Sequence, residues 1–319
     1  MERKRWLTWG KRVFTVLLLL LIPALLYMLA RNLDWNEVRQ SLKSYGPGKL
    51  LLGFALALCS YAVFSCYDLL GRAYTGHKLP ARQVLPVAFV CYAFNLNFTT
   101  WVGGVALRYR LYSRLGLDTP TITKIITLGI LTNWIGYMAL AGTVFALRLV
   151  KLPESWAVGG TGLQLIGALM MALAVGYVLA CGYARRRTWR VREHEITLPS
   201  LRMALAQVGL GASNWTLMAM LIYWLLPHDL FFPSILGILL ISCVAGVVAH
   251  IPAGLGVLET VFLALLQGQI SQGSLVAALL GYRTFYYLIP LLIAVTAYLV
   301  LEKRAKAMRQ ESKAALPKS

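Results

Sequence analysis

The sequence predicts an all-α polytopic membrane protein, and three features of its composition and pattern indicate that class. Hydrophobic residues make up 59% of the 319 residues and charged residues only 13%, about half the charged share of an ordinary soluble domain. The apolar residues gather in eight long segments. The Lys and Arg residues that give the net charge of +19 lie in the short stretches between those segments. Basic loops of this kind position a membrane protein against anionic lipid, so we predict no nucleic-acid partner.

Six of the eight apolar segments have the length of a single membrane crossing, which needs about 20 residues. They are 13–30, 48–70, 120–147, 161–183, 201–226 and 275–300. The first run is longer than a signal-peptide core of roughly 7–15 residues, so we expect it to remain as a span after a basic, cytoplasmic N-terminus, 1–12. Between the first two spans, Trp35, Val38 and Leu42 follow Asp34 and predict either a short interfacial helix or a plain loop.

Two interrupted segments, 83–106 and 234–267, decide the topology. If 83–106 crossed once, the Arg-rich loop 184–200 would face outside, against the positive-inside rule. If 83–106 instead enters from the cytoplasm, turns near Gly103 and Gly104 and returns, that loop stays inside, and 234–267 becomes a hairpin that enters from outside. Most of the 31 Lys and Arg residues then lie inside. We therefore predict six spanning helices, two re-entrant hairpins and cytoplasmic termini.

This topology makes the two halves of the chain inverted repeats. Residues 13–147 read span, span, re-entrant hairpin, span, and residues 161–300 repeat the order from the opposite side. Residues 301–319 form a basic cytoplasmic tail. The glycine breaks fall at matching places in the two hairpins. Interrupted segments at corresponding places in two halves point to a transporter's site near the membrane midplane.

A carboxylate inside a membrane is costly and by default marks a functional group with a partner. Glu259 follows Gly254 and Gly256 within the second hairpin. Arg283 lies about eight residues into the last span, at a similar depth. We predict a Glu259–Arg283 ion pair, which is either purely structural or also engages a charged substrate group.

The first hairpin offers a second set of candidate binding residues. Half-helix N-termini near Gly103 and Gly104 would present free N–H groups, which favour a phosphate. Arg108 or Arg110 could hold that phosphate with two hydrogen bonds. Both arginines would suit a position at the cytoplasmic headgroup level equally well.

Polar side chains within the spans leave more than one interpretation open. Asn133 and Asn214 are candidates either for lining a cavity or for hydrogen bonds between helices. Tyr286 suits lipid packing as well as a specific role. Asp68 and Arg72 are spaced i, i+4, which predicts a local pair at a cytoplasmic helix end.

The sequence contains no signature of catalysis. It lacks an HExxH motif, a CxxC pair, a P-loop and a GxSxG motif. The five cysteines lie in apolar segments without metal-type spacing: Cys59, Cys66, Cys91, Cys181 and Cys243. We therefore predict no catalytic residues, no disulfide, no metal site and no cofactor.

Several motifs resemble the lysylphosphatidylglycerol synthase transmembrane (flippase-region) family. The segment 252–259, PAGLGVLE, is similar to that family's P-G-G-x-G-x-x-E element, with Ala253 where the family often has glycine. The segment 283–290, RTFYYLIP, resembles its R-x-x-Y-Y-x-x-P last span. Four further segments resemble the family's stand-alone inner-membrane branch: 66–70, 101–104, 108–114 and 132–134.

The resemblance implies a flippase-type fold in a bacterial inner membrane. Bifunctional members of the family add a soluble aminoacyl-transferase domain that modifies phosphatidylglycerol with lysine. We expect the 319 residues to lack that domain, so lysyl transfer is not implied. The leading hypothesis is a protein that moves a phospholipid, with an anionic or aminoacylated lipid as a candidate, between leaflets. The alternative is a non-transporting membrane subunit or scaffold for a phospholipid-synthesis enzyme.

Overall fold

Long apolar helices make up most of the fold. The computed structural model describes residues 35–98, 104–150, 152, 159–184, 188–191, 194–227, 230–249 and 254–314. Within these residues, six helices are long and apolar enough to cross a membrane: Pro47–Thr75, Thr119–Ala146, Gly160–Tyr183, Leu201–Leu225, Phe232–Ala249 and Gln272–Leu301. The predicted helical membrane protein is confirmed at this level. The first predicted span, 13–30, lies outside the described residues.

The elements follow the predicted apolar segments closely. In chain order they are α2 (Trp35–Lys43), α3 (Pro47–Thr75), α4 (Ala81–Asn97), α5 (Leu107–Arg114), α6 (Thr119–Ala146), α7 (Gly160–Tyr183), β1 (Thr188–Val191), β2 (His194–Thr197), α8 (Leu201–Leu225), α9 (Phe232–Ala249), α10 (Val257–Leu265), α11 (Gln272–Arg283), the π-helical turn η3 (Thr284–Leu288) and α12 (Ile289–Ala314). Each interrupted segment is thus divided into a longer and a shorter helix, α4 with α5 and α9 with α10.

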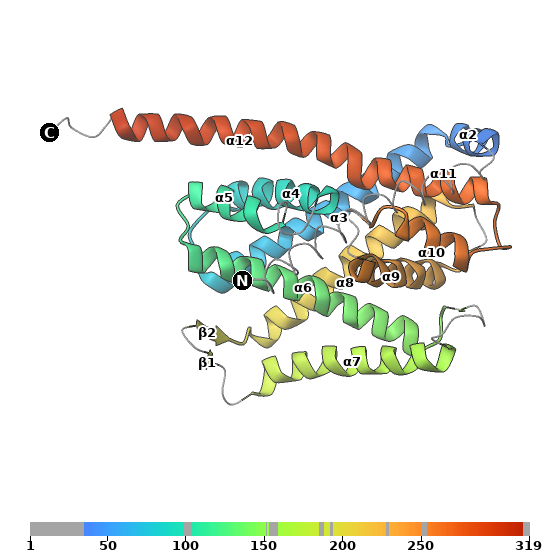
Figure 1. The fold of residues 1–319 in the computed structure, drawn as a ribbon. Helices are drawn as coiled ribbons and strands as arrows, with labels where there is room; N and C mark the ends of the chain where they lie inside the picture. The colour runs from blue at the N-terminus through green and yellow to red at the C-terminus, as the bar shows by residue number, and fades with distance from the viewer. Residues whose placement is uncertain are drawn as a thin grey trace, which may run out of the picture.

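The two ends of the bundle can be named from the contacts at the ends of α3 and α8 (Figure 1). At one end, the Tyr45 hydroxyl donates to the carbonyl oxygen of Leu225 at 2.9 Å, and α2 lies nearby. At the other, the Tyr74 hydroxyl donates to the carbonyl oxygen of Thr197 in the β1–β2 ribbon. The two helices are therefore antiparallel. We call these the α2 end and the ribbon end.

The helix α6 crosses α8 at a pair of glycines. A Cβ on Gly136 would meet the backbone of Gly211, and a Cβ on Gly211 would meet the carbonyl oxygen of Thr132. Close backbone approach at small residues is a common way for helices to associate within a membrane. Gln207 strengthens the crossing, because its amide donates to the hydroxyl of Thr132 at 3.0 Å.

Replacing Gly211 by alanine should therefore loosen this crossing. The added methyl group has no room, and overpacking of this kind costs about 1–3 kcal/mol, so we expect a lower unfolding temperature in detergent. Gly209 in the same helix has open space around its Cα. Gly209→Ala is the matched control and should leave the unfolding temperature unchanged or raise it slightly, because alanine favours a helix. Equal effects of the two substitutions would contradict the proposed crossing.

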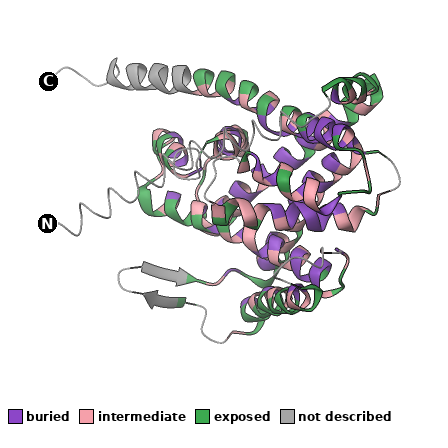
Figure 2. Cartoon of the chain, turned by 45° about the vertical axis from the view of Figure 1, so that its right-hand side comes forward, coloured by how far each residue is buried: buried purple, intermediate pink, exposed green. Residues whose placement is uncertain are grey.

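Apolar side chains are distributed as a membrane protein requires. Figure 2 shows buried residues gathered in the middle of the bundle and exposed ones on its outer helices. On α7, Leu165, Leu169 and Leu173 are more than half exposed. Such a face suits contact with lipid chains rather than water.

The all-α prediction missed a two-stranded antiparallel ribbon in the Arg-rich loop. In its register Thr188 pairs with Thr197 and Val191 with His194. The two strands are rich in β-branched and aromatic residues, which favour strands. The neighbouring arginines dominated the sequence pattern, so that the segment was interpreted only as a loop that sets orientation.

Of the two alternatives for the segment after Asp34, the structure has the helix, α2. Its Val38 is buried against Val276 and Ala277 of α11. The Glu37 carboxylate accepts the backbone N–H of Gly273 at 3.2 Å, at the N-terminus of α11, where the helix dipole favours negative charge. The helix α2 therefore docks on the start of the last long helix. Asp34 itself lies outside the described residues.

Candidate functional site

Two glycines shape the described part of the break between α9 and α10. Gly254 has φ 55° and Gly256 has φ 79°. Residues with a Cβ rarely adopt this left-handed backbone, so both positions favour glycine. The N–H of Gly256 donates to Oε2 of Glu259 at 2.9 Å, so the carboxylate caps the N-terminus of α10. Residues 250–253 lie outside the described part of the chain.

Glu259 and Arg283 form the predicted ion pair. Nε of Arg283 donates to Oε1 of Glu259 at 2.9 Å, and Nη2 donates to Oε2 at 3.4 Å. Nη2 also donates to the carbonyl oxygen of Gly254 at 3.0 Å. The arginine thus ties α11 to the glycine break. The two side chains are 11% and 14% exposed, so the pair is largely buried without being sealed.

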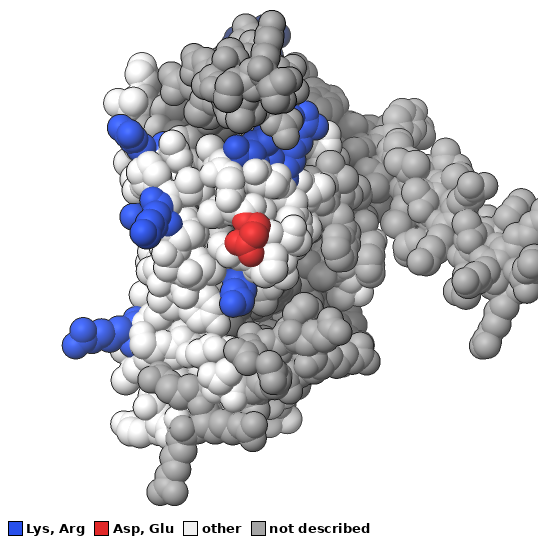
Figure 3. Space-filling model, turned by 90° about the vertical axis from the view of Figure 1, so that its left-hand side faces the viewer, with Lys and Arg blue, Asp and Glu red and all other residues white. Residues whose placement is uncertain are grey.

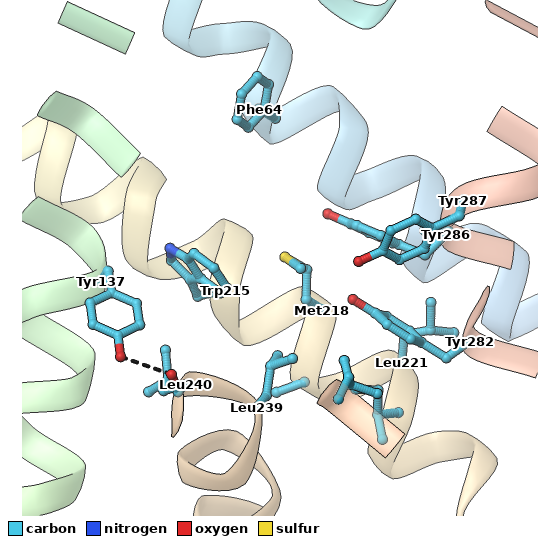
Figure 4. Packing of buried hydrophobic residues seen from close by; sticks show 14 of the residues in the cluster. Phe64, Tyr137, Trp215, Met218, Leu221, Leu239, Leu240, Tyr282, Tyr286 and Tyr287 are labelled. Carbon is cyan, nitrogen blue, oxygen red and sulfur yellow. Dashed lines mark hydrogen bonds between the residues drawn. The ribbon is translucent and has the colours of Figure 1, made fainter. Parts of the chain in front are cut away.

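A π-helical turn, η3, follows Arg283 directly. A π turn adds one residue to the helical turn and often marks a functional site. Here it brings Tyr286 and Tyr287 to the buried side together with Tyr282. Figure 4 shows the three rings projecting from the last helix with their hydroxyls directed toward Met218 of α8. The Tyr287 ring centre lies 4.7 Å from the Arg283 guanidinium carbon, a cation–π contact.

Tyr286 belongs to a buried polar cluster that joins four elements. Its hydroxyl lies 2.7 Å from Oγ of Ser60 in α3 and 2.7 Å from the Tyr92 hydroxyl in α4. Oδ1 of Asn214 in α8 accepts from Ser60 at 2.8 Å, and its amide donates to the Tyr92 hydroxyl at 3.4 Å. The hydrogen bonds between helices foreseen as one role for Asn214 are therefore present.

A second buried ion pair joins α3 to α5. Nη2 of Arg108 lies 3.1 Å from Oδ1 of Asp68, and Nε donates to Oδ2 at 3.3 Å. The Tyr112 hydroxyl donates to the same carboxylate at 2.7 Å. Asp68 is 1% and Arg108 7% exposed. The predicted local pair of Asp68 with Arg72 is wrong, because the carboxylate faces α5 and bonds to its side chains.

The two arginines are held in the same way, one in each half of the chain. Each binds a carboxylate through Nε and Nη2 and donates to the carbonyl oxygen of a glycine at a helix break, Gly104 or Gly254. The sequence analysis found both arginines and both glycines but missed Asp68 and Tyr112 as partners of Arg108. An aspartate inside an apolar helix was the available signal.

Two other predicted site residues do not join either pair. Arg110 is exposed, with its guanidinium carbon 5.9 Å from the Tyr298 ring centre of α12. The backbone carbonyl of Asn133 accepts from the Trp215 indole at 3.4 Å. Gly103 lies outside the described residues. Within the described part of the chain, no three His, Cys, Asp or Glu side chains are placed to hold a metal ion.

Comparison with known proteins identifies the family. The sequence matches the family described as the lysylphosphatidylglycerol synthase TM region over residues 13–294. The chain belongs to this family. It is 47% identical over 309 residues to inner membrane protein YbhN of Escherichia coli (strain K12), covering 96% of this chain and 97% of that protein. The resemblance that the sequence motifs indicated is confirmed.

Two further relatives show the range of the family. The chain is 33% identical over 284 residues to the uncharacterized protein slr0712 of Synechocystis sp., covering 87% of this chain and 88% of that protein. It is 20% identical over 303 residues to a phosphatidylglycerol lysyltransferase of Staphylococcus haemolyticus, covering 92% of this chain but 34% of that enzyme. Family membership and the six apolar helices establish a membrane protein, and the similarity to YbhN supports the inner membrane.

Proposed function

We propose that this member of the lysylphosphatidylglycerol synthase TM-region family moves a phospholipid or a related lipid between the leaflets of a bacterial inner membrane. The observation that carries the proposal is the Glu259–Arg283 pair at the glycine break. Charges in a membrane interior are costly and mark functional sites. Both side chains of this pair keep some exposure, which suits exchange with the charged groups of a lipid.

The proposal includes a re-entrant hairpin in each half. The longer arms α4 and α9 have 17 and 18 residues, and the shorter arms α5 and α10 have 8 and 9. At 1.5 Å per residue, the shorter arms extend about 12–14 Å, less than half of a hydrocarbon core of about 30 Å. The same order of long arm, break and short arm in both halves supports an inverted repeat.

The ends at which the arms begin and finish also support re-entry. The arm α4 follows α3 at the ribbon end, and α5 leads into α6 there, where the Tyr109 hydroxyl contacts the Thr123 hydroxyl at 2.7 Å. The arm α9 begins where the Ser234 hydroxyl donates to the carbonyl oxygen of Leu149, just after α6. The arm α10 leads back to α11, beside α2. Each segment therefore enters and leaves at one end.

We assign the ribbon end to the cytoplasm. Figure 3 looks at this end and shows Lys and Arg side chains spread over it, with little acidic surface. The exposed basic residues in the loops and helix starts of this end are Lys78, Arg82, Lys124 and Arg202. With the predicted span 13–30, the positive-inside rule then favours a cytoplasmic position for both termini.

The two pairs supply the chemistry that a lipid headgroup needs. The planar guanidinium of Arg283 can hold a phosphate with two hydrogen bonds, and the Glu259 carboxylate can hold an ammonium group. On the ribbon side, Arg108 or Arg110 would serve the phosphate. A headgroup that carries both charges can open the pair without leaving either charge unpaired. Since two relatives are named phosphatidylglycerol lysyltransferases, phosphatidylglycerol and its aminoacylated forms are the first lipids to test.

The direct test is headgroup translocation by purified protein. Vesicles of phosphatidylethanolamine and phosphatidylglycerol are prepared with and without the protein, each with a trace of acyl-chain-labelled phosphatidylglycerol. A membrane-impermeant quencher removes the outer-leaflet label in both preparations, and the further loss of label that began in the inner leaflet reports the exchange. We expect protein-containing vesicles to exchange the label faster. Rates equal to those of protein-free vesicles would remove the transport proposal.

A second candidate function is a non-transporting membrane subunit. The two-pronged geometry of the Asp68–Arg108 pair favours it, because the Asp68 carboxylate is already held by Arg108 and Tyr112. Under this alternative, affinity purification from membranes recovers a phospholipid-synthesis enzyme, and vesicles with wild-type protein exchange lipid no faster than protein-free vesicles. Recovery of such an enzyme without any exchange activity would favour the scaffold over the transporter.

A further inference from the structure

Four buried polar side-chain atoms have no hydrogen-bond partner among the residues that the structure describes. They are the Tyr67 and Tyr282 hydroxyls, Nε2 of His77 and Oδ1 of Asn95. The two tyrosines are fully buried. A buried hydroxyl without a partner is unfavourable, and a phenylalanine would fill the same space without that cost. Each hydroxyl therefore has a capacity for hydrogen bonding that the described residues do not use.

The Tyr282 ring is separated from Arg283 of the Glu259–Arg283 pair by one other aromatic ring. The ring of Tyr287 is 5.8 Å from the Tyr282 ring, centre to centre, and 4.7 Å from the Arg283 guanidinium carbon. In Figure 4 the Tyr282 hydroxyl points in the same direction as those of its two neighbouring tyrosines, toward α8.

The Tyr67 ring is likewise separated from Arg108 of the other ion pair by one aromatic ring. The ring of Phe64 is 4.5 Å from the Tyr67 ring and 5.9 Å from the Arg108 guanidinium carbon. A guanidinium has five N–H groups, and among the described residues three of those of Arg108 have acceptors. Each half thus has a buried hydroxyl without a hydrogen-bond partner, which we call an orphan hydroxyl, together with an aromatic ring and a paired arginine.

The two places are joined by continuous contact. Phe64 stacks on Tyr92 with ring centres 3.5 Å apart. The Tyr92 hydroxyl bonds to that of Tyr286, whose ring stacks 5.4 Å from Tyr282. The orphan hydroxyls therefore lie at the two ends of the buried cluster around Tyr286, one toward each ion pair.

We propose that the hydroxyls of Tyr282 and Tyr67 are headgroup contacts that donate hydrogen bonds to phosphate oxygens of the lipid. This inference rests on the proposed function and adds residues to its site. A phenol donates well to an anionic oxygen, and the arginine one ring away attracts the same phosphate. The cost of leaving each hydroxyl unpaired in the empty protein is then offset when the lipid is bound.

The test removes tyrosine hydroxyls that lack a hydrogen-bond partner and compares the effect with removal of a hydroxyl that has one. Tyr282→Phe and Tyr67→Phe should leave the unfolding temperature unchanged or higher and slow exchange of labelled phosphatidylglycerol by about tenfold or more, the effect expected when a hydrogen bond to a charged group is lost. Tyr137→Phe is the matched control. The Tyr137 hydroxyl donates to the carbonyl oxygen of Leu240 at 2.8 Å, so its removal should lower the unfolding temperature.

Two outcomes would overturn the inference. One is wild-type exchange by both orphan variants. The other is a loss of stability in both that matches Tyr137→Phe, which would show that the hydroxyls are structural.

Direct binding separates this inference from the transport proposal. If wild-type protein exchanges no label, binding of short-chain phosphatidylglycerol and of inorganic phosphate is measured by calorimetry in detergent. The inference then expects the lipid to bind and both orphan variants to bind it about tenfold more weakly. Equal affinity of wild type and variants, or binding of inorganic phosphate alone, would contradict it.

Discussion

Replacing Asp68 by alanine should destabilise the protein more than any other single change considered, by about 3–5 kcal/mol. Removing one partner of a buried ion pair leaves the other charge uncompensated in a low-dielectric interior. Arg108 is almost fully buried and, among the described residues, would keep the carbonyl oxygen of Gly104 as its one acceptor. The measurement is the unfolding temperature of purified protein in detergent, together with the yield from membranes.

Two variants control for this prediction. Asp118→Ala removes an exposed carboxylate just before α6 and should have a much smaller effect. Exchanging both members of the pair for apolar residues, Asp68→Leu with Arg108→Met, should recover much of the lost stability, because a buried pair and a well-packed apolar pair are often similar in free energy. A double variant as unstable as Asp68→Ala would show that more than the lone charge is responsible.

The second large effect is expected on lipid exchange. Arg283→Lys keeps the positive charge but loses the planar, two-pronged donor, and Glu259→Gln removes the negative charge at nearly constant shape. If the pair binds the headgroup, each change should slow exchange of a labelled aminoacylated phosphatidylglycerol, whose headgroup carries both charges, by about tenfold or more, since hydrogen bonds to charged groups contribute about 1.5–3 kcal/mol. Rates are compared among variants that remain folded.

Lys124→Ala is the matched control, because this basic side chain is exposed on α6 and contacts neither ion pair. It should exchange lipid at the wild-type rate. If the Glu259 and Arg283 variants also do so while wild-type protein transports, the pair is structural and the headgroup site lies elsewhere. Transport itself would stand in that case.

Much of the fold could be predicted because hydropathy and helix breakers are local features. Five of the predicted spans match α3, α6, α7, α8 and the helix from α11 to α12, and both interrupted segments are divided near their glycines. The ribbon was missed because the strands are only four residues long and lie among arginines.

The part of the candidate site that could be predicted is the ion pair whose depth in the membrane follows from position along the chain. Glu259 and Arg283 are on neighbouring elements and only 24 residues apart, so their pairing followed from the topology. The partners Asp68 and Arg108 are 40 residues apart on elements joined through another hairpin arm. A competing i, i+4 spacing favoured Arg72 instead. The orphan hydroxyls depend on side-chain packing, which no sequence pattern shows.

The central claim is that a lipid headgroup enters the bundle beside the Glu259–Arg283 pair. Crosslinking tests it most directly, with a phosphatidylglycerol analogue that carries a photoreactive group on its headgroup, protein in vesicles and mass spectrometry of the labelled peptides. The proposal predicts labels on 254–259 and on 282–287, reduced in Arg283→Lys. Labels confined to lipid-facing residues such as Leu165 and Leu169 of α7, with none at the pair, would contradict it.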